Sequence, residues 1–270
     1  MRALGAQGVG TYRTKPQPGL RSLNAADPSA VARILADVSP DVIFFAAANP
    51  NVDWCENEPE QAERENLDPL RTMLTAADHR ALIAYSSDYV FDGTAGPYAE
   101  TDPVSPISVY GRIKVELERL VLAAGGTVIR TTGVFGLEPS PAKNFALRLA
   151  AALARGEPVR IPSDQIANPT YADDLATASL GIARTGTCGI WHVGGPDLLA
   201  RDAFARLVAE SFDADPRLIE GVRTRELGQA APRPLRGGLR CERYLSHFGF
   251  PPGRAARDAL TALREDQRRA

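Results

Sequence analysis

The stretch ALIAYSSDYVFDGTAGPYAETDPVSPISVYGRIKVELERLVLAAGGTVIRT (81–131) decides the fold of this chain, because it alternates two patterns. ALIAYSS (81–87) and TVIRT (127–131) have the composition of β-strands, and SVYGRIKVELERLVLAA (108–124) has apolar residues at helical spacing. A strand, a helix and a second strand in this order predict a unit of an α/β fold with a mainly parallel sheet.

The same alternation continues on both sides of this stretch. DVIFFAAA (41–48) is a continuous apolar run, which predicts a strand covered on both faces, and GVGTYR (8–13) also suits a strand. DPSAVARILADV (27–38) predicts a helix with Asp27 as its N-cap and proline at its first position. Further helices are expected at 59–78 (bent at Pro69), 142–155, 171–184, 201–212 and 253–268, strands at 158–162 and 189–193, and a loop at 222–240.

Composition and charge exclude several classes of protein. The 270 residues carry a net charge of −2, whereas a non-specific nucleic-acid binder needs a strong positive field. No apolar run approaches the roughly 20 residues of a membrane span, and no signal peptide precedes the fold. Three cysteines without metal-type spacing indicate a reducing, cytoplasmic location, and three scattered histidines indicate no metal site.

Tyr110 and Lys114 carry the strongest chemical signal. Four residues apart on a helix, they share one face, and a nearby ammonium lowers the pKa of a phenol and suits it to proton transfer. Alone, this pattern is as often a solvated helix face. Here, however, Ser87 ends the preceding strand, where open α/β sheets bind ligands, and its hydroxyl can hold a substrate carbonyl.

With these residues in place, the sequence resembles the extended short-chain dehydrogenase/reductase family, in its dTDP-4-dehydrorhamnose reductase-like branch. The resemblance is carried by residues 85–119 and by PDVIFFAAANPNVDWCENEPEQAERENL (40–67), VIRTTGVFG (128–136) and DQIANPTYADDLA (164–176). It implies a Rossmann-type doubly wound parallel sheet with a smaller α/β C-terminal substrate domain. The expected domains are 1–137 and 138–270, with a segment near 165–195 returning to the first.

The resemblance also implies a reaction and a set of roles. The expected reaction is reduction of a nucleotide-linked 4-keto-6-deoxy sugar, dTDP-linked, by NADPH, so that the cofactor is NADP, with NAD allowed. The catalytic residues would be Ser87, Tyr110 and Lys114. The cofactor would be bound by Arg13, Ala46, Ala47, Ala48, Asn66, Ser86, Tyr110 and Lys114. The substrate would be bound by Ser87, Asp88, Tyr89, Asn144 and Arg233, with no metal.

Several of these residues have simpler alternatives. Arg13, followed by Lys15, suits the 2′-phosphate of NADP, but both also suit an exposed loop. Asn66 is about as compatible with an exposed position on a helix as with a cofactor contact. Asn144 and Arg233 are equally compatible with a structural cap or an exposed charge. Thr131-Thr132-Gly133 lacks the aromatic residue of rhamnose-type reductases, which leaves the sugar open.

The N-terminus departs from the family pattern of a strand, a glycine-rich turn and a helix. We interpret RALGAQG (2–8) as the end of the family's first helix, with the preceding strand and phosphate loop absent. The alternative makes Gly5, Gly8 and Gly10 a shortened phosphate loop. On the first interpretation, we expect NADP(H) to bind this chain more weakly than a dTDP-sugar does.

Two other functions compete with the reductase. One is an epimerase or dehydratase of the same superfamily, which keeps its nicotinamide through the cycle. The other is a non-catalytic homologue similar to the regulatory subunit of methionine adenosyltransferase. A homodimer is compatible with each of the three functions.

Overall fold

A parallel four-stranded sheet forms the centre of the computed structural model, which describes residues 7–138 and 143–269. Its strands run in the order β10-β5-β4-β3: β3 (Val42–Phe45), β4 (Ala81–Ser87), β5 (Thr127–Thr131) and β10 (Gly189–His192). Every residue of β5 is buried, as an interior strand covered on both faces requires. The sequence therefore predicted these strands correctly, although β3 is shorter than the apolar run 41–48.

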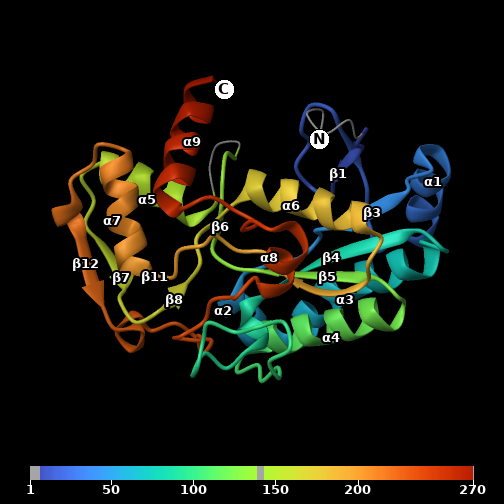
Figure 1. Cartoon of the computed structure of the whole chain (residues 1–270), viewed down its shortest axis with the longest axis horizontal. Helices are drawn as coiled ribbons and strands as arrows, with labels where there is room; N and C mark the ends of the chain where they lie inside the picture. Colours follow the sequence, from blue (N-terminus) through green and yellow to red (C-terminus); the bar gives the residue numbers. More distant parts are fainter. Residues whose placement is uncertain (1–6, 139–142, 270) are drawn as a thin grey trace.

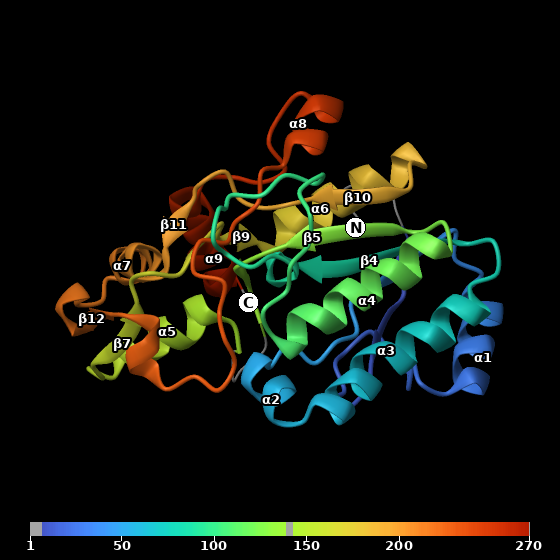
Figure 2. The ribbon, with the colours of Figure 1, turned by 90° about the horizontal axis from the view of Figure 1, so that it is seen from below.

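Helices cover both faces of this sheet (Figures 1 and 2). One face carries α1 (Pro28–Val38), α3 (Pro59–Ala76) and α4 (Val109–Ala123), packed in one apolar cluster. The other face carries α6 (Ala172–Thr185) and α8 (Glu242–Phe248). These layers confirm the expected doubly wound α/β class.

Local sequence signals set where these helices begin. Asp27 caps α1, and the Ser108 side chain caps α4 by accepting from the Gly111 nitrogen at 3.2 Å. Gly111 is required by packing, because a Cβ there would lie 2.3 Å from the Tyr89 carbonyl oxygen. The short helix η2 (Asp88–Val90) therefore lies directly against the first turn of α4.

A second apolar cluster holds the remaining elements together, seen at one end of the molecule in Figure 1. Its helices are α5 (Phe145–Ala154), α7 (Arg201–Ser211) and α9 (Ala256–Arg269). Short strand pairs accompany them: β7 (Val159–Pro162) with β12 (Ile219–Val222), β6 (Val134–Phe135) with β9 (Thr170–Tyr171), and β8 (Ile166–Ala167) with β11 (Leu199–Ala200). Because β10 pairs with β5, the chain returns to the main sheet after β9.

The N-terminal strands form a separate parallel pair, β1 (Gly10–Tyr12) with β2 (Leu20–Ser22). Gly5 and most of RALGAQG lie outside the described residues. The glycine-loop alternative needs a helix directly after Gly10, yet the first helix within residues 7–138 is α1, which follows β2. Gly10 thus has a strand position.

Several short elements were not predicted from the sequence. They are the helices α2 (Val52–Asn57) and α8, the short strands β2, β6, β8, β9, β11 and β12, and the 3-10 helices η2, η3 (Pro216–Leu218) and η4 (Thr224–Leu227). The expected helices occur within a few residues of their predicted limits, and Pro69 lies inside α3. Among the described helices, none combines the length and apolar character needed to cross a bilayer.

We predict that Leu260→Ala lowers the free energy of unfolding by about 2–5 kcal/mol, because it leaves a cavity in the second cluster. Leu260 is fully buried on α9. Leu245→Ala on α8 is the matched control, since Leu245 is 51% exposed and its loss should cost less than about 1 kcal/mol. Urea unfolding of both variants measures the difference, and equal losses would contradict this packing.

Candidate active site

The candidate site lies at the carboxyl end of β4, where β4 meets the first turn of α4. Ser87 is the last residue of β4, and Tyr110 and Lys114 lie on the buried face of α4. The structure therefore brings together the three residues that sequence reasoning selected as catalytic. The solvated-face alternative does not hold, because the side chains of α4 at these positions are buried.

Lys114 is a buried ammonium with a single backbone acceptor. It is 4% exposed, and its Nζ donates to the Tyr85 carbonyl oxygen at 3.0 Å. Burial lowers its pKa to about 8, and the neighbouring Glu118 carboxylate acts in the opposite direction. The Nζ lies 5.6 Å from the centre of the Tyr110 ring, so the two side chains adjoin as predicted.

Tyr110 differs from the expectation in the direction of its pKa. Burial raises the pKa of the phenol well above its ordinary value, and neighbouring Tyr89, Asp88 and Cys55 act in the same direction. A hydrogen bond with Ser87 opposes this rise. The sequence-based expectation of a lowered phenol pKa is thus wrong for this arrangement, because desolvation outweighs the cationic neighbour. Tyr110 holds its proton firmly, as an acid must before it donates.

Ser87 is oriented by the residue that follows it. Its Oγ donates to Asp88 Oδ1 at 3.1 Å and accepts from the Tyr89 nitrogen at 3.3 Å. Asp88 is 3% exposed, burial raises its pKa, and its side chain also bonds Thr132 and the Gly238 nitrogen. Asp88, expected at the substrate, therefore lies beneath Ser87 and joins the end of β4 to the loop before α8.

A wall of small side chains adjoins this site. Ala46, Ala47 and Ala48 follow β3 and are exposed, so a flat ligand can approach the backbone there. Asn66 is buried behind this wall, where its Oδ1 accepts from the Asn49 nitrogen at 2.9 Å. This exposed small-residue surface next to Lys114 fits a nicotinamide cofactor.

The other two expected cofactor residues have different surroundings. Ser86 is 4% exposed and donates to Glu118 Oε1 at 2.5 Å, on the far side of β4 from open surface. Arg13 is exposed on the turn after β1. Ser86 supports the site from within, whereas Arg13 is free to meet a ligand from solvent.

On the substrate side, Tyr89 meets Tyr110 edge-on, with ring centres 5.6 Å apart. Arg233 is paired rather than free, because its Nη2 lies 2.8 Å from Asp53 Oδ2. The other oxygen of this carboxylate, Oδ1, accepts from the Ala231 nitrogen. This pair fixes the loop 222–240 to α2. Asn144 is the N-cap of α5: its side chain donates to the Gly136 carbonyl and accepts from the Leu147 nitrogen. Asn144 therefore has the role of a structural cap, the alternative given for it from the sequence.

Two arginines that the sequence reasoning missed lie beside this region. The Arg201 guanidinium stacks 4.4 Å from the centre of the Phe145 ring, and it is electrostatically coupled to Tyr89, Arg148 and Arg233. Burial is the main cause that lowers the pKa of Arg201, and the Arg148 and Arg233 charges lower it further. No sequence pattern marks Arg201, because only the packing of α7 against α5 directs it to the site.

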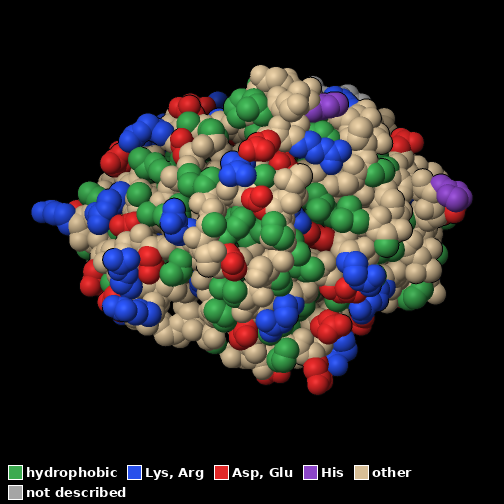
Figure 3. All heavy atoms as spheres, turned by 60° about the horizontal axis from the view of Figure 1, so that its bottom comes forward, with side chains coloured by type: hydrophobic (Ala, Val, Ile, Leu, Met, Phe, Trp, Pro, Cys, Tyr) green, Lys and Arg blue, Asp and Glu red, His purple; other side chains and the backbone are tan. Residues whose placement is uncertain are grey.

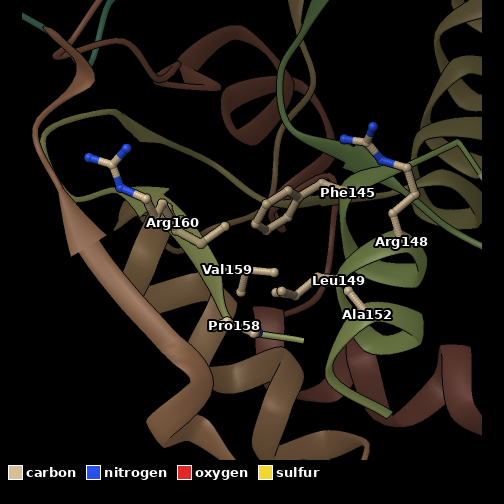
Figure 4. A pocket seen from close by; sticks show the side chains of 8 residues that line it. Phe145, Arg148, Leu149, Ala152, Pro158, Val159 and Arg160 are labelled. Atoms are coloured by element: carbon tan, nitrogen blue, oxygen red, sulfur yellow. The ribbon is translucent and has the colours of Figure 1, made fainter. Parts of the chain in front are cut away.

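A pocket of about 500 Å³ continues from Phe145 and Arg148 (Figure 4). The guanidinium groups of Arg148 and Arg160 lie on its two sides, with apolar side chains between them. Its lining consists of Phe145, Arg148, Leu149, Ala152, Pro158, Val159, Arg160 and Ile161. An apolar floor between two cations suits a planar base joined to phosphates.

Charge elsewhere is mixed. On the face drawn in Figure 3, basic and acidic side chains are interspersed. Within residues 7–138 and 143–269, no group of three His, Cys, Asp or Glu side chains is placed to hold a metal ion, and the three cysteines are unpaired.

Comparison with known proteins identifies the family of the chain. Residues 2–268 match the model of the RmlD substrate binding domain. The chain belongs to this family. A dTDP-4-dehydrorhamnose reductase of Mycobacterium tuberculosis (strain H37Rv) is 35% identical over 251 residues, which cover 88% of this chain and 80% of that protein. Methionine adenosyltransferase 2 subunit beta of Danio rerio is 29% identical over 272 residues, covering 96% and 84%.

A solved member of the RmlD family has the same fold. The crystal structure of dTDP-4-dehydrorhamnose reductase from Bacillus anthracis str. Ames, in complex with NADP, aligns with a TM-score of 0.84 at 25% identity. The alignment covers 90% of this chain and 87% of that one. The expected family and Rossmann-type fold are therefore confirmed.

We predict that ketone reduction weakens as the pH rises through about 8, where the Lys114 ammonium loses its proton. The sign follows from the lowered pKa: Lys114 is charged below this pH and neutral above it. Lys114→Arg stays charged, so its alkaline limb should move above about pH 10. The profile of kcat/KM between about pH 6 and 10 provides the measurement, and identical limbs in both proteins would contradict the assignment.

Proposed function

We propose that this protein is an NADPH-dependent reductase of a nucleotide-linked 4-keto-6-deoxy sugar, with NAD(H) as the less favoured cofactor. The observation that carries the proposal is the assembly of Ser87, Tyr110 and Lys114 at the end of β4, beside the exposed wall Ala46–Ala48. The reductases named among its relatives support the dTDP-linked substrate.

In this proposal the Ser87 hydroxyl turns its hydrogen from Asp88 Oδ1 to the substrate carbonyl oxygen, and Tyr110 delivers the proton to that oxygen. The bound nicotinamide supplies the hydride that reduces the carbonyl carbon. Lys114 stabilises the phenolate left on Tyr110 and orients the cofactor ribose. The raised pKa of the phenol keeps the proton in place until the carbonyl oxygen gains negative charge.

The nucleotide of the substrate is assigned to the arginines beyond Tyr89. Arg201, Arg233 and Arg148 are electrostatically coupled, and a diphosphate would offset their mutual repulsion. The pocket at Phe145 would then hold the base, and Tyr89 would lie along the sugar.

A regulatory function is the second candidate, because the chain is also similar to methionine adenosyltransferase 2 subunit beta. A subunit that only binds a partner has no need of a buried phenol and ammonium beside a strand-end serine. Copurification of a partner together with absent ketone reduction would favour this second function. A nicotinamide retained through purification would instead favour an epimerase or dehydratase.

We expect NADPH oxidation with dTDP-4-keto-6-deoxy sugars at millimolar NADPH, and a loss of about 10²–10⁴-fold in Tyr110→Phe. The variant lacks only the phenolic hydroxyl, so dTDP affinity should be retained. Tyr85→Phe is the matched control, because its phenol bonds Ser179 at 3.0 Å outside the site. Turnover of Tyr110→Phe within threefold of the parent would reject Tyr110 as the acid.

Arg201→Gln should raise the KM for the dTDP-sugar by about 10- to 100-fold with little change in the KM for NADPH, because one charge-assisted contact to the diphosphate is lost. Arg257→Gln on the exposed side of α9 is the control. Calorimetric titration with dTDP gives the same comparison without turnover. Equal dTDP affinity in all three proteins would remove Arg201 from the substrate site.

A homodimer and a cytoplasmic location belong to the same proposal. Three unpaired cysteines suit a reducing compartment. Sedimentation equilibrium of the purified chain would decide between one and two copies.

A further inference from the structure

A buried ionic network lies behind the candidate site and takes no part in the chemistry described so far. Glu118 on α4 accepts three hydrogen bonds: from Ser86 Oγ at 2.5 Å, from Arg130 Nε at 2.8 Å and from Arg130 Nη2 at 2.7 Å. The Glu118 and Arg130 side chains are 5% and 2% exposed. Removing two charges from water costs free energy, so a buried ion pair contributes little to stability by itself. A contribution to stability is therefore not an obvious reason for this pair.

The position of this network relative to the site is specific. Ser86 precedes Ser87 on β4, and Arg130 lies opposite Ser86 on β5. Glu118 lies one helical turn after Lys114, so the two side chains share a face of α4. Lys114 itself donates to the carbonyl of Tyr85, the residue before Ser86.

We propose that Glu118 is a positioning residue for the reductase site: held by Arg130 and Ser86, its carboxylate fixes α4 against β4 beside Ser87 and presents a negative charge to Lys114. This inference rests on the proposed function. Arg130 is the anchor, since its bidentate contact leaves the carboxylate one orientation. Two rings contact Arg130 in turn. The guanidinium carbon of Arg130 lies 5.0 Å from the centre of the Phe91 ring, and its Nη1 lies 3.4 Å from His192 Nε2.

The charges around Lys114 make the inference testable by pH. The titratable groups coupled to Lys114 are Glu118 on α4 and Cys55 on α2, and Tyr110 adjoins it on α4. Of these, Glu118 acts most strongly after burial and favours the ammonium. His192 faces Arg130 from β10, and its pKa is lowered to about 3 by burial and by the Arg130 charge. His192 is therefore neutral over the pH range of the assay, and Lys114 is the group expected to titrate on its alkaline side.

The test variant is Glu118→Met/Arg130→Met, which removes both charges and leaves neither unpaired in the interior. We expect it to fold and bind dTDP, while the alkaline limb of kcat falls by about one pH unit or more from about 8. At about pH 6, where Lys114 stays charged, kcat should still lie about tenfold or more below the parent value, because the carboxylate that fixes α4 beside Ser87 is gone. Asp174→Leu/Arg254→Leu is the matched control, an ion pair of 2.7 Å between α6 and the segment before α9, and its limb should not move.

A second readout does not depend on turnover. The sequence contains three lysines, Lys15, Lys114 and Lys143, so ¹³C-lysine labelling gives three Cε signals, which Lys114→Arg assigns. Titration of the Lys114 signal should give an ammonium that deprotonates at lower pH in the double variant than in the parent. That shift without any ketone reduction would reject the proposed function and leave the role of Glu118 intact.

Glu118→Asp covers the case in which the double variant does not fold. It keeps the charge and the Arg130 partner but shortens the side chain, so the alkaline limb should remain near 8 while kcat falls by about tenfold or more. An unmoved Lys114 titration in the folded double variant, or parental kcat in Glu118→Asp, would overturn the inference.

Discussion

Burial of Lys114, Glu118 and Arg130 between α4 and the main sheet is the constraint on which the rest of this site depends. Ionised groups this far from water persist only when their hydrogen bonds are satisfied with good geometry. Here β4 provides the Tyr85 carbonyl and the Ser86 hydroxyl, and β5 provides Arg130. The polar network therefore fixes the helix and both strands in one register.

Close backbone contact completes this arrangement. Gly111 lets the first turn of α4 pack on Tyr89, and Asp88 bonds Ser87 on one side and the Gly238 nitrogen on the other. The loop that brings Arg233 is in turn held to α2 by Asp53. The phenol, the hydroxyl and the arginines thus come from distant parts of the chain, but each is tied to the end of β4.

Much of the fold and of the candidate site was predictable from the sequence, because short-range patterns carry them. Tyr110 and Lys114 share a helix, and Ser87 ends an apolar strand, so their meeting follows from βαβ geometry. The positions of Arg201 and Arg148 beside the candidate site were not predictable. They are ordinary arginines on two amphipathic helices, and only the packing of α5 against α7 brings them together. The expected direction of the Tyr110 pKa failed for a related reason: spacing indicates a neighbouring charge but not the degree of burial.

The sequence by itself determined the α/β class, the limits of most helices and of the longer strands, and the family, because apolar periodicity, caps and the stretch 85–119 are local properties. Tertiary structure alone decided which polar atoms form hydrogen bonds and ion pairs within the protein. It turned Asn144 into a helix cap, placed Asp88 beneath Ser87, paired Arg233 with Asp53 and enclosed Glu118 with Arg130. The physical reason is that a hydrogen-bond partner is chosen by proximity in space, which sequence spacing specifies only within a single helix or turn.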